Sequence, residues 1–364
     1  MNFDPERLHV IRCYERLPPL SGGMERHIAQ LTAAQRDLGV RVTEVFNRGT
    51  PEGESVQVWR GASIDQIRPY LLRSALFYAA AARRRFPLHD DRNRVVHVHG
   101  DWPAFLFGSI FGRLIGARVV AASLHEWMRG SPHHYALSLR HCDPIFATGL
   151  QEARRLSAIT CKSVTHIPSA PSDVFFTKPR RRADPSDLIV VGSLIGRKNI
   201  ELVLAIAERR PGWSISIYGG GPDYDNLERM RRQKGLNNVR FHGSVGQETL
   251  HAAMSASSLY LNTALAEGSP TAALEAMASG LPVVLTPSND YSDLVVEGVN
   301  GVVSANWNID ELVATIERFL NEPARLVRAR TAARETAKQH NWPEKARVVT
   351  EAMLMACVRH PEAH

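Results

Sequence analysis

The sequence predicts an α/β protein with two Rossmann-like domains, each built around a parallel sheet. Short apolar runs of strand-forming residues alternate with helical patterns along the whole chain, which is typical of parallel α/β sheets. At 364 residues, the chain is also long for a single hydrophobic core. A proline-rich and basic stretch, residues 167–185, interrupts the alternation before an apolar run restarts it at 188–192. We therefore place the domain boundary between residues 178 and 179.

The apolar runs define the predicted strands, and helices fill the intervals between them. In the first domain the predicted strands cover residues 8–13, 40–46, 94–98, 117–123 and 145–148. In the second domain they cover residues 188–192, 213–218, 239–241, 259–262 and 282–285. No internal repeat or low-complexity tract is evident, so we expect two α/β domains in succession.

Composition and charge favour a cytoplasmic globular protein. Hydrophobic residues make up 44% of the chain and charged residues 22%, and no apolar run reaches the ~20 residues that span a bilayer. The N-terminus lacks a signal-peptide pattern. The four cysteines form no Cys-x-x-Cys pair, which argues against a zinc knuckle or a redox motif. Lysine and arginine outnumber the acids by 44 to 37, and the net charge of +7 favours anionic partners.

Residues 267–275 combine a helix start with two carboxylates. Ser269 suits the N-cap and Pro270 the first helical position, where its missing N–H costs nothing. The free backbone N–H groups of a helix start attract phosphate, and the carboxylates of Glu267 and Glu275 accept hydrogen bonds from sugar hydroxyls. The segment therefore indicates a site for a phosphorylated sugar or a nucleotide sugar. An ordinary acid-biased helix start explains the same spacing.

Two further loops follow predicted strands and suit phosphate binding. Arg197 and Lys198 come just after the first strand of the second domain, where Lys198 is the expected clamp on a diphosphate. A solvated helix start is the alternative for these two cations. Gly22 and Gly23 follow the first predicted strand and open a helix, so their backbone N–H groups can approach a ligand closely. A turn glycine pair without a ligand is the alternative.

Two patterns resemble metal sites but are explained better in other ways. His97 and His99 form a His-x-His pattern at a strand end, yet no carboxylate or third histidine has matching spacing. Structural or cleft-lining roles are therefore favoured for both. Asp223 and Asp225 form an Asp-x-Asp pattern, but they follow a glycine run and begin a helix, where the dipole favours acids. We predict that no divalent metal is required.

The segment 267–275 resembles the Glu-x7-Glu motif of retaining glycosyltransferases of family 4, and nearly the whole chain falls into register with that family. The resemblance implies the GT-B fold, in which two Rossmann-like domains face each other across a cleft at the carboxyl ends of their sheets. The N-terminal domain, 1–178, is then the acceptor side, and 179–341 is the nucleotide-sugar side. The resemblance also implies that a C-terminal helix, at residues 342–364, crosses back onto the N-terminal domain.

The same resemblance assigns roles to particular residues. Lys198 stabilises the departing diphosphate, Glu267 positions the hexose, and His125 hydrogen-bonds the hexose or the reacting centre. The family usually carries an Arg where this chain has Ser193, and Arg197 is the expected substitute for the missing cation. The residues implied in donor binding are Gly22, Gly23, Ser193, Arg197, Gly219, Gly221, Phe241, Gly268, Ser269, Pro270, Thr271 and Glu275.

The implied activity is transfer of a hexose-type sugar from a UDP- or GDP-linked donor to an acceptor hydroxyl, with retention of configuration and without a cofactor. The expected acceptor is a lipid-linked glycan or a cell-surface polysaccharide precursor at the inner face of the plasma membrane. A basic and apolar segment, residues 67–85, suits peripheral contact with an anionic membrane. A domain helix with a solvated basic end is the alternative, and no nucleic-acid partner is expected.

Three other functions are compatible with the same residues. A glycosyltransferase with a soluble small-molecule acceptor fits the same cleft, and liposome binding distinguishes it from the membrane-bound type. A nucleotide-sugar epimerase also uses two facing Rossmann-like domains, but it needs no acceptor. A non-catalytic sugar-nucleotide binding module is suggested by Ser193 at the usual Arg position.

Overall fold

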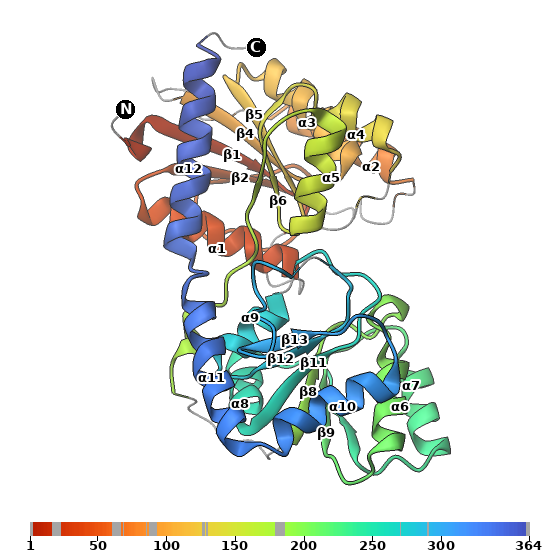
Figure 1. The fold of residues 1–364 in the computed structure, drawn as a ribbon. Helices are drawn as coiled ribbons and strands as arrows, with labels where there is room; N and C mark the ends of the chain where they lie inside the picture. The colour runs from red at the N-terminus through yellow and green to blue at the C-terminus, as the bar shows by residue number, and fades with distance from the viewer. Residues whose placement is uncertain are drawn as a thin grey trace. The chain divides into compact units, whose positions relative to one another are not determined.

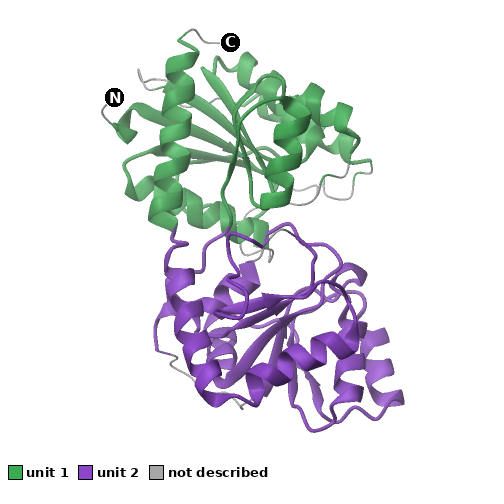
Figure 2. Cartoon of the chain, viewed as in Figure 1, with its two compact units in different colours: residues 1–168, 342–364 green, residues 169–341 purple. Residues whose placement is uncertain are grey.

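The computed structural model divides into two compact units (Figure 2). Unit 1 contains Met1–Pro168 and Trp342–His364, and unit 2 contains Ser169–Asn341. The structure describes residues 3–16, 23–59, 67, 69–84, 86, 93–125, 128, 130–178, 186–269, 271–289 and 291–361.

The boundary between the units lies at Pro168, earlier than the residue 178 that the sequence predicts. Phe175, in the 3-10 helix η3 (Asp173–Phe176), is fully buried in the core of unit 2 and meets the ring of His251 edge to face. Arg334 also donates a hydrogen bond to the carbonyl of Phe176. These contacts attach the segment after Pro168 to unit 2, so the proline-rich stretch is an imprecise marker of the boundary.

The core of unit 1 is a parallel sheet with the strand order β3-β2-β1-β4-β5-β6-β7 (Figure 1). Its strands are β1 (Leu8–Cys13), β2 (Arg41–Phe46), β3 (Ser55–Gln57), β4 (Asn93–Gly100), β5 (Val119–Leu124), β6 (Cys142–Ala147) and β7 (Val164–His166). Its helices are η1 (Pro5–Arg7), α1 (Gly23–Asp37), α2 (Tyr70–Ala81), α3 (Trp102–Leu114), α4 (Pro132–Leu139), α5 (Leu150–Thr160) and α12 (Trp342–Arg359). Strands β1 and β5 are buried along their whole length, as expected for a parallel sheet that helices cover on both faces.

Helix α12 belongs to unit 1 although it is the last helix of the chain. Gln35 of α1 donates a hydrogen bond to Thr350 at 2.9 Å, and the rings of His27 and Trp342 meet edge to face with centroids 5.0 Å apart. Met353 of α12 is fully buried. The final helix is therefore part of the core of the first unit.

Unit 2 contains a second parallel sheet, with the strand order β10-β9-β8-β11-β12-β13. Its strands are β8 (Ser186–Val191), β9 (Ile215–Tyr218), β10 (Val239–Phe241), β11 (Ser257–Asn262), β12 (Val283–Leu285) and β13 (Gly301–Val303). Its helices after η3 are η4 (Gly196–Lys198), α6 (Ile200–Arg209), α7 (Tyr224–Gln233), α8 (Gln247–Ala256), α9 (Thr271–Ala278), α10 (Ile309–Leu320) and α11 (Pro323–Lys338). The loops that follow β8, β9 and β11 all lie at the carboxyl edge of this sheet, because the strands are parallel.

The predicted α/β fold with two parallel sheets is confirmed. The sequence pattern does not indicate β3, β7 or β13, each of which has three residues and lies at the edge of its sheet. Three residues are too few to show a hydrophobic pattern typical of a strand. These short strands form because they pair with a neighbouring strand of the sheet. In the described residues, every helix is too short or too polar to traverse a lipid bilayer.

Candidate active site

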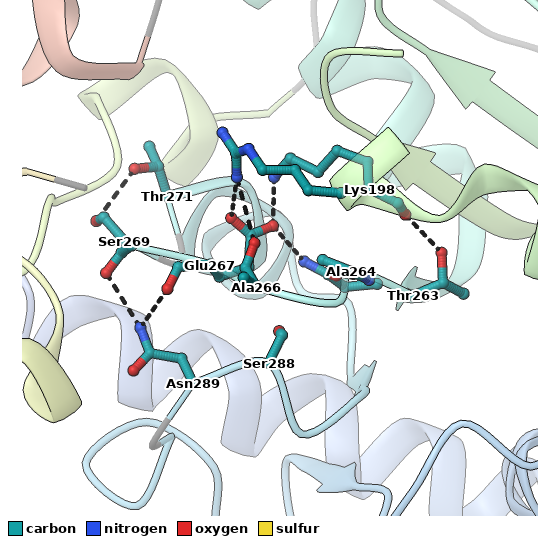
Figure 3. Close-up of polar contacts among 12 residues, drawn as sticks. Lys198, Thr263, Ala264, Ala266, Glu267, Ser269, Thr271, Ser288 and Asn289 are labelled. Atoms are coloured by element: carbon teal, nitrogen blue, oxygen red, sulfur yellow. Dashed lines mark hydrogen bonds and ion pairs between the residues drawn. The ribbon is translucent and has the colours of Figure 1, made fainter. Parts of the chain in front are cut away.

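A cluster of charged side chains lies at the carboxyl edge of the unit 2 sheet (Figure 3). Lys198 ends η4 just after β8, and Glu267 lies in the loop between β11 and α9. Lys198 Nζ donates a hydrogen bond to Glu267 Oε1, and Arg197 Nη1 lies 3.6 Å from Glu267 Oε2. The Glu267 side chain is 6% exposed, whereas those of Lys198 and Arg197 are 17% and 29% exposed. Two partly exposed cations therefore border a buried carboxylate.

Two asparagines hold Glu267 in place. Asn262, the last residue of β11, donates from Nδ2 to Glu267 Oε1 at 3.1 Å. Asn289 donates from Nδ2 to the carbonyls of Glu267 and Gly268, at 3.0 and 3.1 Å (Figure 3). The backbone N–H of Glu267 donates to the carbonyl of Ser288 at 3.1 Å. Glu267 is thus fixed through both its side chain and its backbone.

The loop of Glu267 is also tied to the turn that carries the two cations. Thr263 Oγ1 donates to the carbonyls of Lys198 and Asn199, at 3.1 and 3.0 Å. The N–H of Leu265 donates to the carbonyl of Arg197 at 2.8 Å. These bonds keep Lys198 and Glu267 together although 69 positions separate them in the sequence.

Helix α9 begins next to this cluster. Its first residue is Thr271, whose Oγ1 lies 3.4 Å from Ser269 Oγ, and Ser269 Oγ accepts a hydrogen bond from the N–H of Ser169. Glu275 lies one turn inside the helix and is almost fully buried. Pro270 lies outside the described residues. The structure therefore brings Glu267, Thr271 and Lys198 together and places Glu275 on the adjoining helix.

The predicted glycine turn packs against the loop that precedes Lys198. A Cβ at Gly219 would overlap the carbonyl oxygen of Gly192, and one at Gly221 would overlap that of Leu194. Gly219 also has φ +141°, a conformation that other residues rarely adopt. Both glycines are therefore required by backbone packing. Ser193, in the same loop, is exposed.

Two other predicted positions lie close to this edge. Phe241 ends β10, and its ring meets that of Tyr224 edge to face with centroids 5.7 Å apart. Asp223 precedes α7 and Asp225 lies in its first turn, as the sequence predicts for acids at a helix start. In the described parts of the chain, no group of three or more His, Cys, Asp or Glu residues is arranged to hold a metal ion.

Unit 1 carries a different cluster, made of buried histidine rings. His125 directly follows β5, and its Nε2 lies 2.8 Å from Nδ1 of His99 in β4. The ring of His97 lies 4.0 Å from that of His99, and its Nε2 pairs with Ser123 Oγ at 2.7 Å. His27 of α1 meets the His125 ring edge to face at 4.7 Å. The side chains of His97 and His99 therefore share one face of β4 and bind neighbouring polar groups.

A buried cation lies near the histidine rings. Arg12 of β1 is almost completely buried, and its guanidinium donates hydrogen bonds to Thr32 and Gln35 of α1. Burial lowers the pKa of Arg12 to about 9, and the carboxylate of Glu44 partly opposes this shift. Burial lowers the pKa of His125 to about 3, with a further contribution from the Arg12 cation. The cluster therefore keeps His125 neutral at ordinary pH.

Burial also keeps the other rings of the cluster neutral. It lowers the pKa values of His27, His97 and His99 well below the usual histidine value, and neighbouring charges add to each shift. Gly23 begins α1, and a Cβ there would meet no atom of the described residues within 4 Å. Packing against the described residues therefore does not require a glycine at position 23. Gly22 lies outside the described residues.

Four residues of these clusters carry no prediction from the sequence: Asn262, Asn289, Arg12 and His27. Asn262 ends a strand at the carboxyl edge of a parallel sheet, and that position is a usable signal. Arg12 lies inside an apolar strand, where an arginine is rarely fully buried. Asn289 and His27 show no local pattern, because their contacts depend on a returning loop and on the packing of α1.

The chain belongs to the GT4-type glycosyltransferases with the GT-B fold. The family model described as "Glycosyl transferases group 1" matches residues 172–340, and the model described as "Glycosyl transferase 4-like domain" matches residues 22–167. The two matches lie on the two sheet-containing units described above. The predicted family is confirmed, and the protein is a glycosyltransferase.

Individual relatives are distant. Over 340 residues the chain is 24% identical to one subunit of the phosphatidylinositol N-acetylglucosaminyltransferase of Arabidopsis thaliana, covering 87% of this chain and 75% of that protein. Over 284 residues it is 27% identical to "GDP-mannose-dependent alpha-(1-6)-phosphatidylinositol monomannoside mannosyltransferase" of Mycolicibacterium smegmatis, covering 70% and 74%. The structure of Anabaena HepE in complex with UDP-glucose matches with a TM-score of 0.73 and 16% identity, covering 96% of this chain and 99% of HepE. This last similarity shows the fold alone.

Proposed function

We propose that the protein transfers a hexose from a nucleotide diphosphate sugar to an acceptor hydroxyl, with retention of the anomeric configuration. The observation that carries this proposal is the arrangement of Lys198 and Arg197 around Glu267, next to the start of α9. The family match to both units supports a donor of this class. The names of the relatives mention a GDP-linked sugar and those of the structures a UDP-linked one, so both bases are candidates.

The two cations stabilise the diphosphate as it leaves. Negative charge grows on the diphosphate in the transition state, so Lys198, Arg197 and the N–H groups that begin α9 bind it more tightly as the bond to the sugar breaks. Arg197 lies within 4 Å of the same carboxylate as Lys198, and it therefore supplies the second cation that Ser193 does not. The acceptor hydroxyl attacks from the face that the diphosphate leaves, which produces retention.

The carboxylates bind the sugars of the donor. A diphosphate near Lys198 competes with Glu267 for the ammonium group, and the oxygens of Glu267 then accept hydrogen bonds from hexose hydroxyls. Asn262 and Asn289 keep Glu267 in position during this exchange. Glu275, one turn into α9, binds the ribose. In unit 1, neutral His125 donates a hydrogen bond to the hexose.

The test is a turnover assay with a panel of UDP- and GDP-linked hexoses. With α-linked donors, we expect release of the nucleoside diphosphate together with an α-linked product, identified by the anomeric proton in its NMR spectrum. Glu267→Ala should lose most of this turnover and keep the unfolding temperature of unit 2. A β-linked product would contradict retention, and full turnover in Glu267→Ala would contradict the assigned site. Interconversion of the donor sugar without an acceptor would identify an epimerase instead.

We further propose that the acceptor is a lipid-linked glycan or polysaccharide precursor and that unit 1 contacts an anionic membrane. Helix α3 packs between α2 and α4, and these three helices expose large apolar side chains. The exposed apolar residues are Leu71, Leu72, Ile110, Leu114 and Leu137. Arg83, Arg84, Arg113 and Arg140 are exposed at or beyond the ends of the same helices. Exposed apolar and basic side chains on adjacent helices suit the boundary of an anionic bilayer, and the two relatives named above have phosphatidylinositol in their names.

Liposome sedimentation tests this surface. The wild-type protein should sediment with vesicles that contain phosphatidylglycerol at low salt, and the double variant Ile110→Asp, Leu114→Asp should not. Val327→Asp is the matched control, because Val327 is an exposed apolar residue on a helix of unit 2. If neither the wild type nor the control binds the vesicles, a soluble small-molecule acceptor becomes the leading alternative.

A further inference from the structure

Two buried histidine rings of unit 1 form a direct hydrogen bond. His99 lies near the end of β4 and His125 directly follows β5, and these strands pair in parallel. His99 Nδ1 lies 2.8 Å from His125 Nε2, and the ring planes are 28° apart with centroids separated by 5.1 Å. Both side chains are buried. The bond therefore couples the protons of the two rings away from water.

This hydrogen bond fixes a tautomer in each ring, because one neutral ring must donate and the other must accept. If His99 donates from Nδ1, its Nε2 is a bare acceptor. If His125 instead donates from Nε2, then Nδ1 of His99 is the acceptor, and the single proton of the neutral His99 ring lies on its Nε2. That nitrogen is buried and has no hydrogen-bond partner within the described part of the chain. A buried N–H without a partner is rarer than a buried acceptor without one, so His99 is favoured as the donor.

We propose that His99 is a positioning residue that holds His125 in its Nδ1–H tautomer, so that His125 donates a hydrogen bond to a hydroxyl oxygen of the transferred sugar. The inference rests on the proposed function, in which His125 contacts the hexose. Nδ1 of His125 forms no hydrogen bond with any residue that the structure describes. A free neutral histidine favours the Nε2–H tautomer, so His99 reverses the intrinsic preference of the ring.

A single neutral tautomer requires that neither ring gains a second proton. Burial lowers the pKa of His125 to about 3, and the Arg12 cation contributes. Burial lowers the pKa of His99 well below its usual value, and His97 and His125 add to that shift. Both rings therefore remain neutral throughout the pH range in which the protein is expected to act.

The packing around His125 does not select a tautomer by itself. His27 meets the His125 ring edge to face at 4.7 Å, and His97 lies 4.0 Å from His99. These ring contacts are compatible with a proton on either nitrogen of His125. A hydrogen bond donated by His99 Nδ1 is compatible only with a proton on Nδ1 of His125. A variant that keeps a ring at position 99 and lacks Nδ1 therefore separates positioning from packing.

The test observes the tautomer of His125 by long-range ¹H–¹⁵N NMR of protein labelled with ¹⁵N-histidine, with His125→Gln to assign the signals. We expect Nδ1–H in the wild-type protein. His99→Phe should shift His125 mainly to Nε2–H, and His99→Asn, whose amide nitrogen can replace Nδ1, should keep Nδ1–H. An Nε2–H tautomer in the wild type, or an unchanged tautomer in His99→Phe, would overturn the proposal.

Kinetics give a second readout. His99→Phe should lower kcat about tenfold through the loss of one oriented hydrogen bond, and His99→Asn should stay near the wild type. His9→Phe is the matched control, because His9 is another buried strand histidine, with Nε2 2.8 Å from Thr43 Oγ1; it should change stability and leave kcat unaltered. Equal losses of kcat in both His99 variants would contradict positioning. Absence of all transfer by the wild type, with the NMR result as expected, would refute the proposed function and leave the tautomer assignment intact.

Discussion

The carboxyl edges of the two sheets differ in charge. In unit 2, Lys198 and Arg197 surround the carboxylate of Glu267, and the two cations remain partly exposed. In unit 1, the corresponding edge carries buried, neutral histidine rings, including His125, and the almost completely buried Arg12 lowers the pKa of His125 further. Two similar folds thus carry different side chains at the same edge: a buried carboxylate with two partly exposed cations in unit 2, and a cluster of neutral histidine rings in unit 1.

Removal of the Lys198 side chain should cause the largest loss of turnover. Lys198→Ala removes the cation closest to Glu267, and we expect kcat to fall by roughly 10²- to 10³-fold, as for the loss of one preorganised donor to a developing negative charge. The measurement is the steady-state release of nucleoside diphosphate. Lys234→Ala is the control, because Lys234 forms an exposed ion pair with Glu208 elsewhere in unit 2. Similar rates in the two variants would remove the electrostatic basis of the site.

A second variant tests whether backbone packing shapes the charged edge. Gly219→Ala places a Cβ against the carbonyl of Gly192 and forces a residue with φ +141° into a strained conformation, so unit 2 should lose about 2–4 kcal/mol of unfolding free energy. Urea unfolding measures this loss. Gly212→Ala is the matched control, since a Cβ there meets no atom of the described part of the chain within 4 Å. Equal stability of the two variants would show that the turn can move.

Acid should weaken unit 1 more than unit 2. The pKa of His125 falls from 6.5 to about 3 on folding, and His27, His97 and His99 shift in the same direction. Between pH 6.5 and 5 the unfolded chain therefore binds more protons, and the stability falls with decreasing pH by about 1.4 kcal/mol per pH unit for each such histidine. Above pH 6.5 this contribution is constant.

Hydrogen exchange followed as a function of pH measures the loss of stability in each unit separately. Peptides from β4 and β5 should lose protection between pH 7 and pH 5, after correction for the intrinsic exchange rate, more steeply than peptides from β11. Unit 2 also has a histidine whose pKa burial lowers, His251, so its expected slope is smaller and not zero. Parallel pH profiles for the two units would contradict the account of a neutral histidine cluster.

Arg197 should contribute less than Lys198. It lies 3.6 Å from Glu267 and its side chain is more exposed, so water screens its charge more effectively. We expect Arg197→Ala to lower kcat about tenfold. Arg232→Ala, which breaks an exposed ion pair with Glu228, is the control. A loss of kcat as large as that in Lys198→Ala would mean that the two cations contribute equally. An unchanged kcat would mean that Arg197 contributes nothing to the rate.

The sequence predicts the central strands and the charged loop of unit 2, because both are local features. The run Ser186–Val191 is apolar in its second half, and the loop with Lys198 follows it directly. The helix start after Glu267 is a local signal as well, but the spacing of the two carboxylates indicates a ligand site only together with the resemblance to the family. The edge strands Ser55–Gln57 and Gly301–Val303 have too few residues to show a pattern.

The histidine cluster of unit 1 could not be predicted in the same way. His99 and His125 are 26 positions apart, and their hydrogen bond depends on the register of β4 against β5. In the sequence, Arg12 is a single polar residue within an apolar strand. Its buried environment depends on α1, whose Thr32 and Gln35 accept hydrogen bonds from its guanidinium. These contacts are set by tertiary packing, for which a single sequence gives no direct signal.

We propose that the charged edge of unit 2 binds the diphosphate of a nucleotide sugar. The decisive experiment is isothermal titration with UDP, GDP and ADP, on the wild type and on Lys198→Ala, Glu275→Ala and His99→Phe. We expect one of the nucleotides to bind the wild type, and Lys198→Ala and Glu275→Ala to weaken that binding at least tenfold. His99→Phe should leave it unchanged, since the proposed role of His99 concerns the sugar and not the diphosphate. Absence of binding by all three nucleotides, or equal affinity in the wild type and Lys198→Ala, would contradict the account.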